Sequence, residues 1–156
     1  MAGKRFSIGA CAWFLVGLSL ACESPLSSHE RHLLREAESR WSARGFQDYA
    51  FEVRRACFCP ELLSQWARVE VVAGQVARVV ILETGTEVSP AERAMFPTVE
   101  EVFSYVRRAP DQDWVEDVQV EFDPLLGFPT LVSSISKPNI ADAGGALYLR
   151  NATPLR

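Results

Sequence analysis

Alternation between apolar and polar residues is the feature that most constrains how this chain folds. Tyr49, Phe51 and Val53 occupy every second position of segment 49–53, so one side of that segment is apolar. A period of two is typical of a strand with one buried face. The other alternating segments are 67–71 and 118–122, and they are followed by apolar runs at 76–82 and 128–135. Because short turns join these pairs of runs, the sequence predicts antiparallel strands.

Two further segments carry a helical pattern. Ser27 with Glu30, and Thr98 with Glu101, form capping boxes, which mark the start of a helix. Apolar residues then recur at helical spacing. They are Leu33, Leu34, Ala37 and Trp41 in the first segment, and Val99, Val102, Phe103 and Val106 in the second. We therefore predict one helix at 28–44, stopped by Gly45, and a second that ends before Pro110.

The order of these elements predicts an α+β fold. One helix precedes three strands and the second helix precedes two more, which gives the order α-β-β-β-α-β-β. Residues 146–149, after Gly144-Gly145, allow a last strand. Each helix has a single apolar stripe, so we expect both to pack on one face of a single antiparallel sheet of five to six strands. The sequence contains no internal repeat.

The N-terminus resembles the signal peptide of a bacterial lipoprotein. Lys4 and Arg5 precede an apolar run at 6–20, and Ala21-Cys22 ends it as a lipobox does. The resemblance implies cleavage after Ala21 and acylation of Cys22, for example with palmitate. We therefore divide the chain into a lipoprotein signal peptide at 1–21, a short tether at 22–28, one α+β domain at 29–151 and a tail at 152–156. Secretion with soluble release and an uncleaved anchor are the alternatives.

This interpretation predicts a location in the bacterial cell envelope, with lipid in a membrane and the domain on the periplasmic face or the cell surface. Six tether residues reach about 20 Å, so the domain stays near that membrane. Loss of Lys4 and Arg5 changes the formal net charge from −4 to −6, and Lys137 is the one lysine left. An acidic domain without a basic stripe argues against a nucleic-acid partner. The pairs Arg54-Arg55 and Arg107-Arg108 are expected to be solvated.

Several motifs resemble a bacterial family of exported proteins that is catalogued as domain of unknown function 6174. The matching segments are Trp41, Asp48-Tyr49-Ala50-Phe51, Cys57-Phe58-Cys59-Pro60, Val69-Glu70-Val71 with Gly74-Gln75-Val76, Thr98-Val99-Glu100-Glu101-Val102-Phe103, and Phe122-Asp123-Pro124 with Gly127-Phe128-Pro129-Thr130. The resemblance covers residues 41–135. It implies a small exported or lipid-anchored domain, and it brings no activity, substrate or catalytic residue.

Residues suited to catalysis are sparse. Both histidines, His29 and His32, lie in the first turn of the first predicted helix, and the sequence has neither a G-x-S-x-G motif nor a Gly-rich phosphate loop. The acidic segment 111–117 lacks the glycine and ligand spacing of a calcium loop, so we expect a solvated turn there, with Trp114 as a flap over the core. We predict no catalytic residues, metal site or cofactor.

Cys57 and Cys59 are the strongest chemical feature of the mature chain, because Cys11 leaves with the signal and Cys22 takes the lipid. In a straight strand their Cα atoms lie about 6.6 Å apart, near the upper limit for a disulfide of about 6.8 Å. The alternation also places Arg55 on the apolar face, where an unpaired charge is costly. We therefore expect the strand to bend or end near Arg54, which also shortens the distance between the cysteines.

Three interpretations of the Cys57/Cys59 pair remain open: a local covalent clamp, a redox-active or metal-binding pair, and free or intermolecularly paired thiols. The first fits a non-catalytic binding or structural domain, anchored to a membrane and contacting an envelope protein. The second fits a thiol redox or metal-handling protein. The sequence favours the first function and leaves the second as the alternative.

Overall fold

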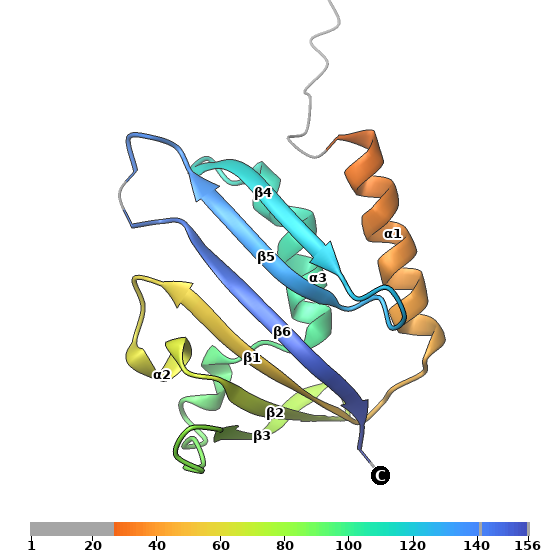
Figure 1. Cartoon of the computed structure of the whole chain (residues 1–156), viewed down its shortest axis with the longest axis vertical. Helices are drawn as coiled ribbons and strands as arrows, with labels where there is room; N and C mark the ends of the chain where they lie inside the picture. Colours follow the sequence, from red (N-terminus) through yellow and green to blue (C-terminus); the bar gives the residue numbers. More distant parts are fainter. Residues whose placement is uncertain (1–26, 141, 156) are drawn as a thin grey trace, which may run out of the picture.

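The computed structural model describes residues 27–140 and 142–155, and within them it shows one six-stranded antiparallel sheet with helices on a single face. The strand order is β3-β2-β1-β6-β5-β4 (Figure 1). The helices and strands are α1 Ser28–Ala43, β1 Tyr49–Cys57, α2 Glu61–Ser64, β2 Ala67–Val72, β3 Gln75–Ile81, α3 Val99–Arg108, β4 Val115–Phe122, β5 Pro129–Ser136 and β6 Gly145–Pro154. Short 3-10 turns cover Arg93–Met95 and Ala109–Asp111. The predicted α+β class is confirmed.

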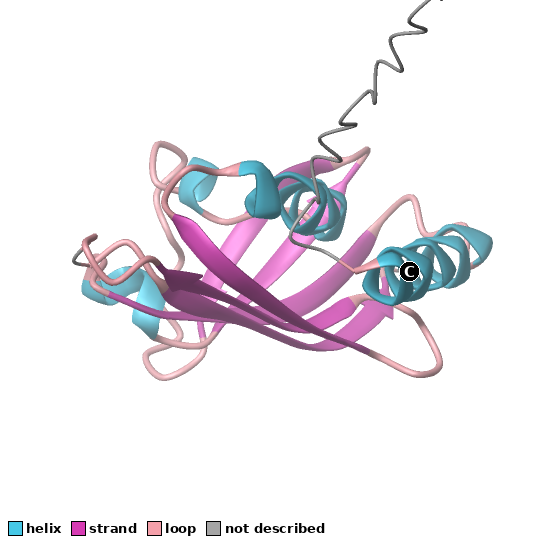
Figure 2. Ribbon diagram, turned by 90° about the horizontal axis from the view of Figure 1, so that it is seen from above, coloured by secondary structure: helices cyan, strands magenta, loops and turns pink. Residues whose placement is uncertain are grey.

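Both predicted helices form where their caps indicate. The capping boxes of Ser27 with Glu30 and of Thr98 with Glu101 are complete, with bonds in both directions. The apolar stripe of α3 is buried against the sheet at Val99, Val102, Phe103 and Val106. Figure 2 shows α1 and α3 above one side of the curved sheet, while the opposite side carries no helix.

The sheet consists of two meanders of the same order, each following a long helix. β1–β2–β3 and β4–β5–β6 are consecutive antiparallel strands, and pairing of β1 with β6 joins them. The sequence treated β6 as a short optional strand, yet it lies at the centre of the sheet and runs to Pro154. Residues 152–154, expected in the tail, therefore belong to the sheet. The alternation fails here because Asn151, at a φ of 55°, sits where the β1–β6 register shifts.

Strand β1 is longer than the sequence predicted. We expected a bend or an end near Arg54, but the strand continues to Cys57 and pairs with β6 throughout this stretch, including Arg55 with Leu147. The side chain of Arg55 is half-buried, so it escapes the full cost of burial that motivated the prediction. The strand therefore carries a cation on the helix-covered face.

A carboxylate at the start of α3 connects the two long helices to β1. Glu100 Oε1 accepts from Trp41 Nε1 at 2.8 Å, and Glu100 Oε2 accepts from the hydroxyl of Tyr49 at 2.5 Å. The Tyr49 hydroxyl also accepts from the backbone N–H of Val99 at 3.0 Å. Burial and the bond to Glu100 raise the pKa of Tyr49 far above its usual range. Both aromatic rings are buried, so their donors depend on Glu100, and a buried donor left without an acceptor costs about 1–3 kcal/mol.

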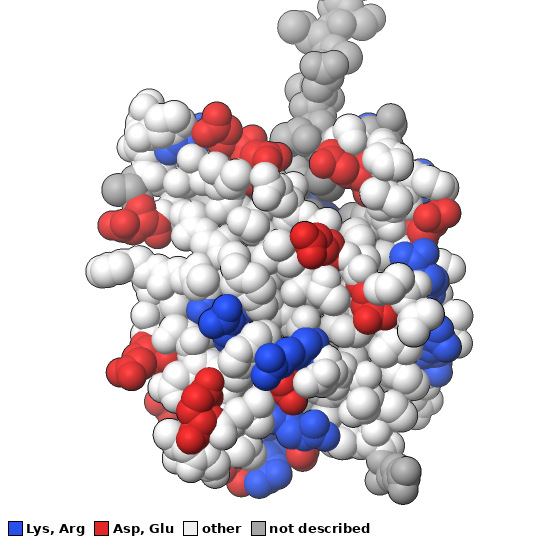
Figure 3. Space-filling model, viewed as in Figure 1, with Lys and Arg blue, Asp and Glu red and all other residues white. Residues whose placement is uncertain are grey.

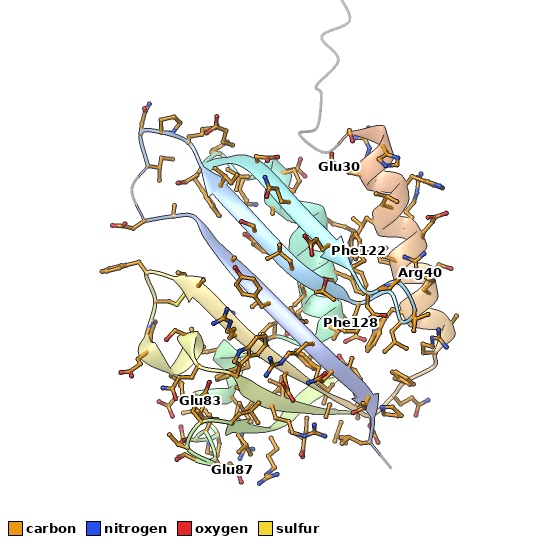
Figure 4. The ribbon with its side chains drawn as sticks, in the orientation of Figure 1. Glu30, Arg40, Glu83, Glu87, Phe122 and Phe128 are labelled. Atoms are coloured by element: carbon orange, nitrogen blue, oxygen red, sulfur yellow. A yellow bond between two sulfur atoms is a disulfide. The ribbon has the colours of Figure 1, made fainter. Side chains whose placement is uncertain are left out.

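The turn between β4 and β5 fits closely against α1. Asp123 Oδ1 accepts from the backbone of Leu125 and Leu126, and Gly127 takes a φ of 87°. A Cβ at position 127 would collide with the carbonyl oxygen of Ala37 and lie 2.9 Å from Arg40 Cβ. Phe122 and Phe128, on either side of this turn, lie between the strands and the helices (Figure 4). Glycine is therefore required by both conformation and space.

Substitution at this turn gives a test with a matched control. Gly74 also has a positive φ, of 75°, but no atom lies within 4 Å of a Cβ built there. Gly74→Ala is expected to cost about 1–2 kcal/mol from backbone strain alone. Gly127→Ala adds the collision with α1, for about 1–3 kcal/mol more. Urea unfolding measures both, and equal losses of stability in the two variants contradict this packing.

Candidate functional site

A cavity of about 360 Å³ lies between α3, the covered face of the sheet, and the segment that leads into β6. Its walls include side chains from β1, α3, β5 and β6, and that of Trp114 just before β4. The polar and charged residues are Arg55, Glu101, Tyr105 and Ser134, and the large apolar ones are Val102, Trp114, Val132 and Leu147. A mostly apolar hollow with a few convergent polar groups is the usual form of a small-molecule site.

Arg55 supplies the cation of this cavity. Its Nη2 donates to the carbonyl oxygen of Met95 at 3.0 Å. Among the described residues no carboxylate oxygen lies within 4.0 Å of its guanidinium, whereas seven other ion pairs meet that limit. Burial lowers the pKa of Arg55 below its ordinary range, but arginine remains charged at neutral pH. Within the described residues, the result is a half-buried positive charge hydrogen-bonded to a carbonyl oxygen and not to a carboxylate.

Two hydroxyl groups face each other in the same cavity. Tyr105 of α3 and Ser134 of β5 have their oxygens 2.6 Å apart, and either can donate to the other. Ser134 is buried, while Tyr105 is partly exposed at the cavity edge. Because the pair holds two hydroxyl protons and uses one between its members, the other is available to a ligand.

Cys57, the last residue of β1, lines the cavity and is paired with Cys59. Cys57 and Cys59 Sγ atoms lie 2.07 Å apart, at disulfide-bonding distance, and the Cα atoms are separated by 5.2 Å. Cys57 lines the cavity opposite Gly145, where a Cβ would lie 2.9 Å from the carbonyl oxygen of Ala56. Phe58, between the cysteines, is 90% exposed. The sequence predicted a first strand that bends or ends near Arg54, whereas β1 continues to Cys57 and brings this residue to the cavity.

The remaining predicted residues lie elsewhere. His29 and His32 are exposed on α1, with His32 Nε2 3.3 Å from Glu36, and within the described chain neither lines the cavity. Across residues 27–140 and 142–155, no group of three or more His, Cys, Asp or Glu side chains is arranged for a metal ion. Trp114 packs half-buried against the core, as expected of a flap, and also forms part of the cavity wall.

Cys22, the predicted lipidation site, and the predicted signal peptide lie outside the described residues. Of the helices that the structure describes, none has the length and apolar character needed to cross a membrane.

Arg54, the neighbour of Arg55 on β1, lies on the open face of the sheet. Arg54 stacks over the rings of Trp66 and Tyr148, with 5.2 Å and 4.9 Å between its Cζ and the ring centroids, and Arg150 lies 3.9 Å from the Trp66 ring. Figure 3 looks onto this face and shows basic and acidic side chains interspersed on it. The two neighbouring arginines were expected to be solvated together, but they point to opposite faces and have different surroundings.

Sequence reasoning missed Tyr105 and Ser134, and it treated Arg55 as a difficulty for the strand and not as part of a site. The one sequence signal for Arg55 as a site residue was the alternation of apolar and polar residues, which put Arg55 on the apolar face of its strand. An arginine at such a position indicates a cavity or a partner for the charge. The hydroxyl pair had no such signal, because it joins residues 29 positions apart.

The fold and the cavity define a small α+β domain with a six-stranded antiparallel sheet and an open pocket between the sheet and its second long helix. The chain belongs to the family of unknown function DUF6174, whose model matches residues 33–154. No curated protein matches the chain, and no solved structure matches it either. The family assignment confirms the resemblance read from the motifs and extends it over most of α1 and all of β6.

Proposed function

We propose that the protein is a bacterial envelope lipoprotein, anchored through Cys22, whose domain binds a ligand or an envelope partner without catalysing a reaction. The observation that carries this proposal is the cavity beside Arg55. It offers a charge, two hydroxyl groups and apolar walls, which are suited to binding. Histidine, the side chain best suited to proton transfer near neutral pH, is absent from its described lining.

The anchored location rests on the sequence of the N-terminus. A positive start, an apolar run and Ala21-Cys22 support acylation, and the described domain begins only a few residues later. The domain then lies close to the membrane surface, and lipid and an envelope protein are its neighbours. The acidic charge balance supports the exclusion of nucleic acid.

Removal of the acylated thiol tests the anchor. Cys22→Ser is expected to leave the protein without acyl mass and to shift it from the membrane to the soluble fraction. Mass spectrometry of the intact protein and membrane fractionation measure the two effects, and Cys11→Ser, inside the predicted signal, is the control that leaves both unchanged. Wild-type protein without acyl mass, or Cys22→Ser protein still in the membrane fraction, contradicts the anchor.

The non-catalytic part of the proposal has its own test. The purified protein is expected to turn over no thiol, peptide or glycan substrate in an activity assay. Turnover of such a substrate that is lost on a single substitution in the cavity contradicts the non-catalytic function.

A second candidate function is thiol redox or metal handling by Cys57 and Cys59. The observation that favours it is the position of Cys57, which faces a cavity while its sulfur lies at bonding distance from that of Cys59. A substrate in the cavity would thus lie next to Cys57.

The reduction potential of the pair separates the two functions. A redox protein is expected to have a potential above about −300 mV, in the range of exchangeable disulfides. A value below about −300 mV, with no metal bound to the purified protein, contradicts the second candidate. Titration against a dithiol buffer and elemental analysis provide these values, and Cys57→Ala/Cys59→Ala protein is the control for signals from other groups.

A further inference from the structure

We propose that the cavity beside Arg55 binds a monoanionic carboxylate that carries a compact apolar body. This inference rests on the proposed binding function and names the ligand class for the same site. The carboxylate can belong to a free organic acid or to the end of a peptide chain, because both present the same chemistry.

The positive charge of Arg55 favours an anionic ligand. A guanidinium has five N–H donors, and within the described residues that of Arg55 makes one hydrogen bond, to the carbonyl oxygen of Met95. A half-buried cation with no carboxylate within 4.0 Å in the described chain gains charge-assisted bonds when a ligand carboxylate arrives. The planar guanidinium matches a carboxylate in a two-bond arrangement.

The surrounding groups favour a single negative charge. Glu101 stands at the cavity rim, held there because its Oε2 accepts from the backbone N–H of Thr98 at 2.8 Å. A second negative charge on the ligand, as on a phosphate monoester, is repelled by this carboxylate. The free hydroxyl proton of the Tyr105–Ser134 pair supplies one additional donor to the ligand's oxygen atoms.

The remaining walls select the body of the ligand. Val102, Trp114, Val132 and Leu147 present apolar surface, and the volume of about 360 Å³ is at the small end of the range for ligand sites. A short alkyl or branched side chain buries apolar area here and gains from it. The geometry therefore combines one anion-binding point with a small apolar compartment.

The chain offers a close control for Arg55. Arg54 is the adjacent residue on the same strand, and its removal changes the net charge equally. Its guanidinium lies on the opposite face of the sheet, over Trp66 and Tyr148, so it takes no part in the cavity.

Calorimetric titration of the full-length protein with paired acids and amides tests the proposal. The pairs are hexanoate with hexanamide, and N-acetylleucine with N-acetylleucinamide; hexyl phosphate tests the preference for a single charge. At least one acid is expected to bind about tenfold or more tightly than its amide, because the amide cannot make charge-assisted bonds with Arg55. Tighter binding of N-acetylleucine identifies a chain end as the source, and tighter binding of hexanoate identifies a free acid.

Variants then test whether Arg55 causes the difference in affinity between acid and amide. Arg55→Met is expected to weaken the preferred acid by about tenfold or more and to leave the amide unchanged, while Arg54→Met leaves both unchanged. Arg55→Lys retains part of the preference. Urea unfolding establishes that each variant is folded; should Arg55→Met fail to fold, Arg55→Gln, which also removes the charge and is expected to weaken the acid selectively, takes its place.

Four results overturn the proposal: no binding of either acid, equal binding of acid and amide, tighter binding of hexyl phosphate than of hexanoate, or equal losses from Arg55→Met and Arg54→Met. None of these bears on acylation of Cys22 or on turnover. Failure of the ligand class is thereby distinguished from failure of the proposed anchored, non-catalytic function.

Discussion

The carboxylate of Glu100 is the interaction on which the arrangement of this domain depends. It accepts from Trp41 on α1 and from Tyr49 on β1, and the Tyr49 hydroxyl in turn accepts from the first backbone N–H of α3. The start of α3 is thereby held against α1 and β1, which lie 50 to 59 positions earlier in the chain. The two donors belong to buried rings, so their bonds cannot be replaced by water without cost.

This orientation also places the cavity. Glu100 is directed toward α1 and β1, whereas Glu101 completes the helix cap and stands at the cavity rim. Tyr105 follows one helical turn after Glu101, and residues four apart lie on the same side of a helix. The position of α3 on the sheet therefore decides how close Tyr105 comes to Ser134. The motif around Glu100 and Glu101 serves the scaffold and the site together.

Most residues of the family motifs have structural roles. Trp41 and Tyr49 meet at Glu100, Asp123 closes the β4–β5 turn, and Gly127 allows that turn to approach α1. Three motif residues, Cys57, Glu101 and Val102, also line the cavity. The cavity itself is formed largely by residues outside the quoted motifs.

The sequence predicted the elements whose pattern is local. Capping boxes and apolar stripes located both long helices, and alternation located β1, β2 and β4. β6 was underestimated because the positive φ of Asn151 interrupts its alternation, and its role depends on pairing with two distant strands. The cavity was not predictable as a whole, because Arg55, Tyr105 and Ser134 come from three elements that only the fold brings together.

The central claim is that Arg55 holds the carboxylate of a small apolar ligand. A crystal structure of the protein grown with N-acetylleucine or hexanoate, whichever binds, tests it most directly. The account predicts the carboxylate within hydrogen-bonding distance of the Arg55 guanidinium and of the Tyr105–Ser134 pair, with the apolar body against Val102 and Trp114. Density for the ligand at any other place, with this cavity holding only water, contradicts the account.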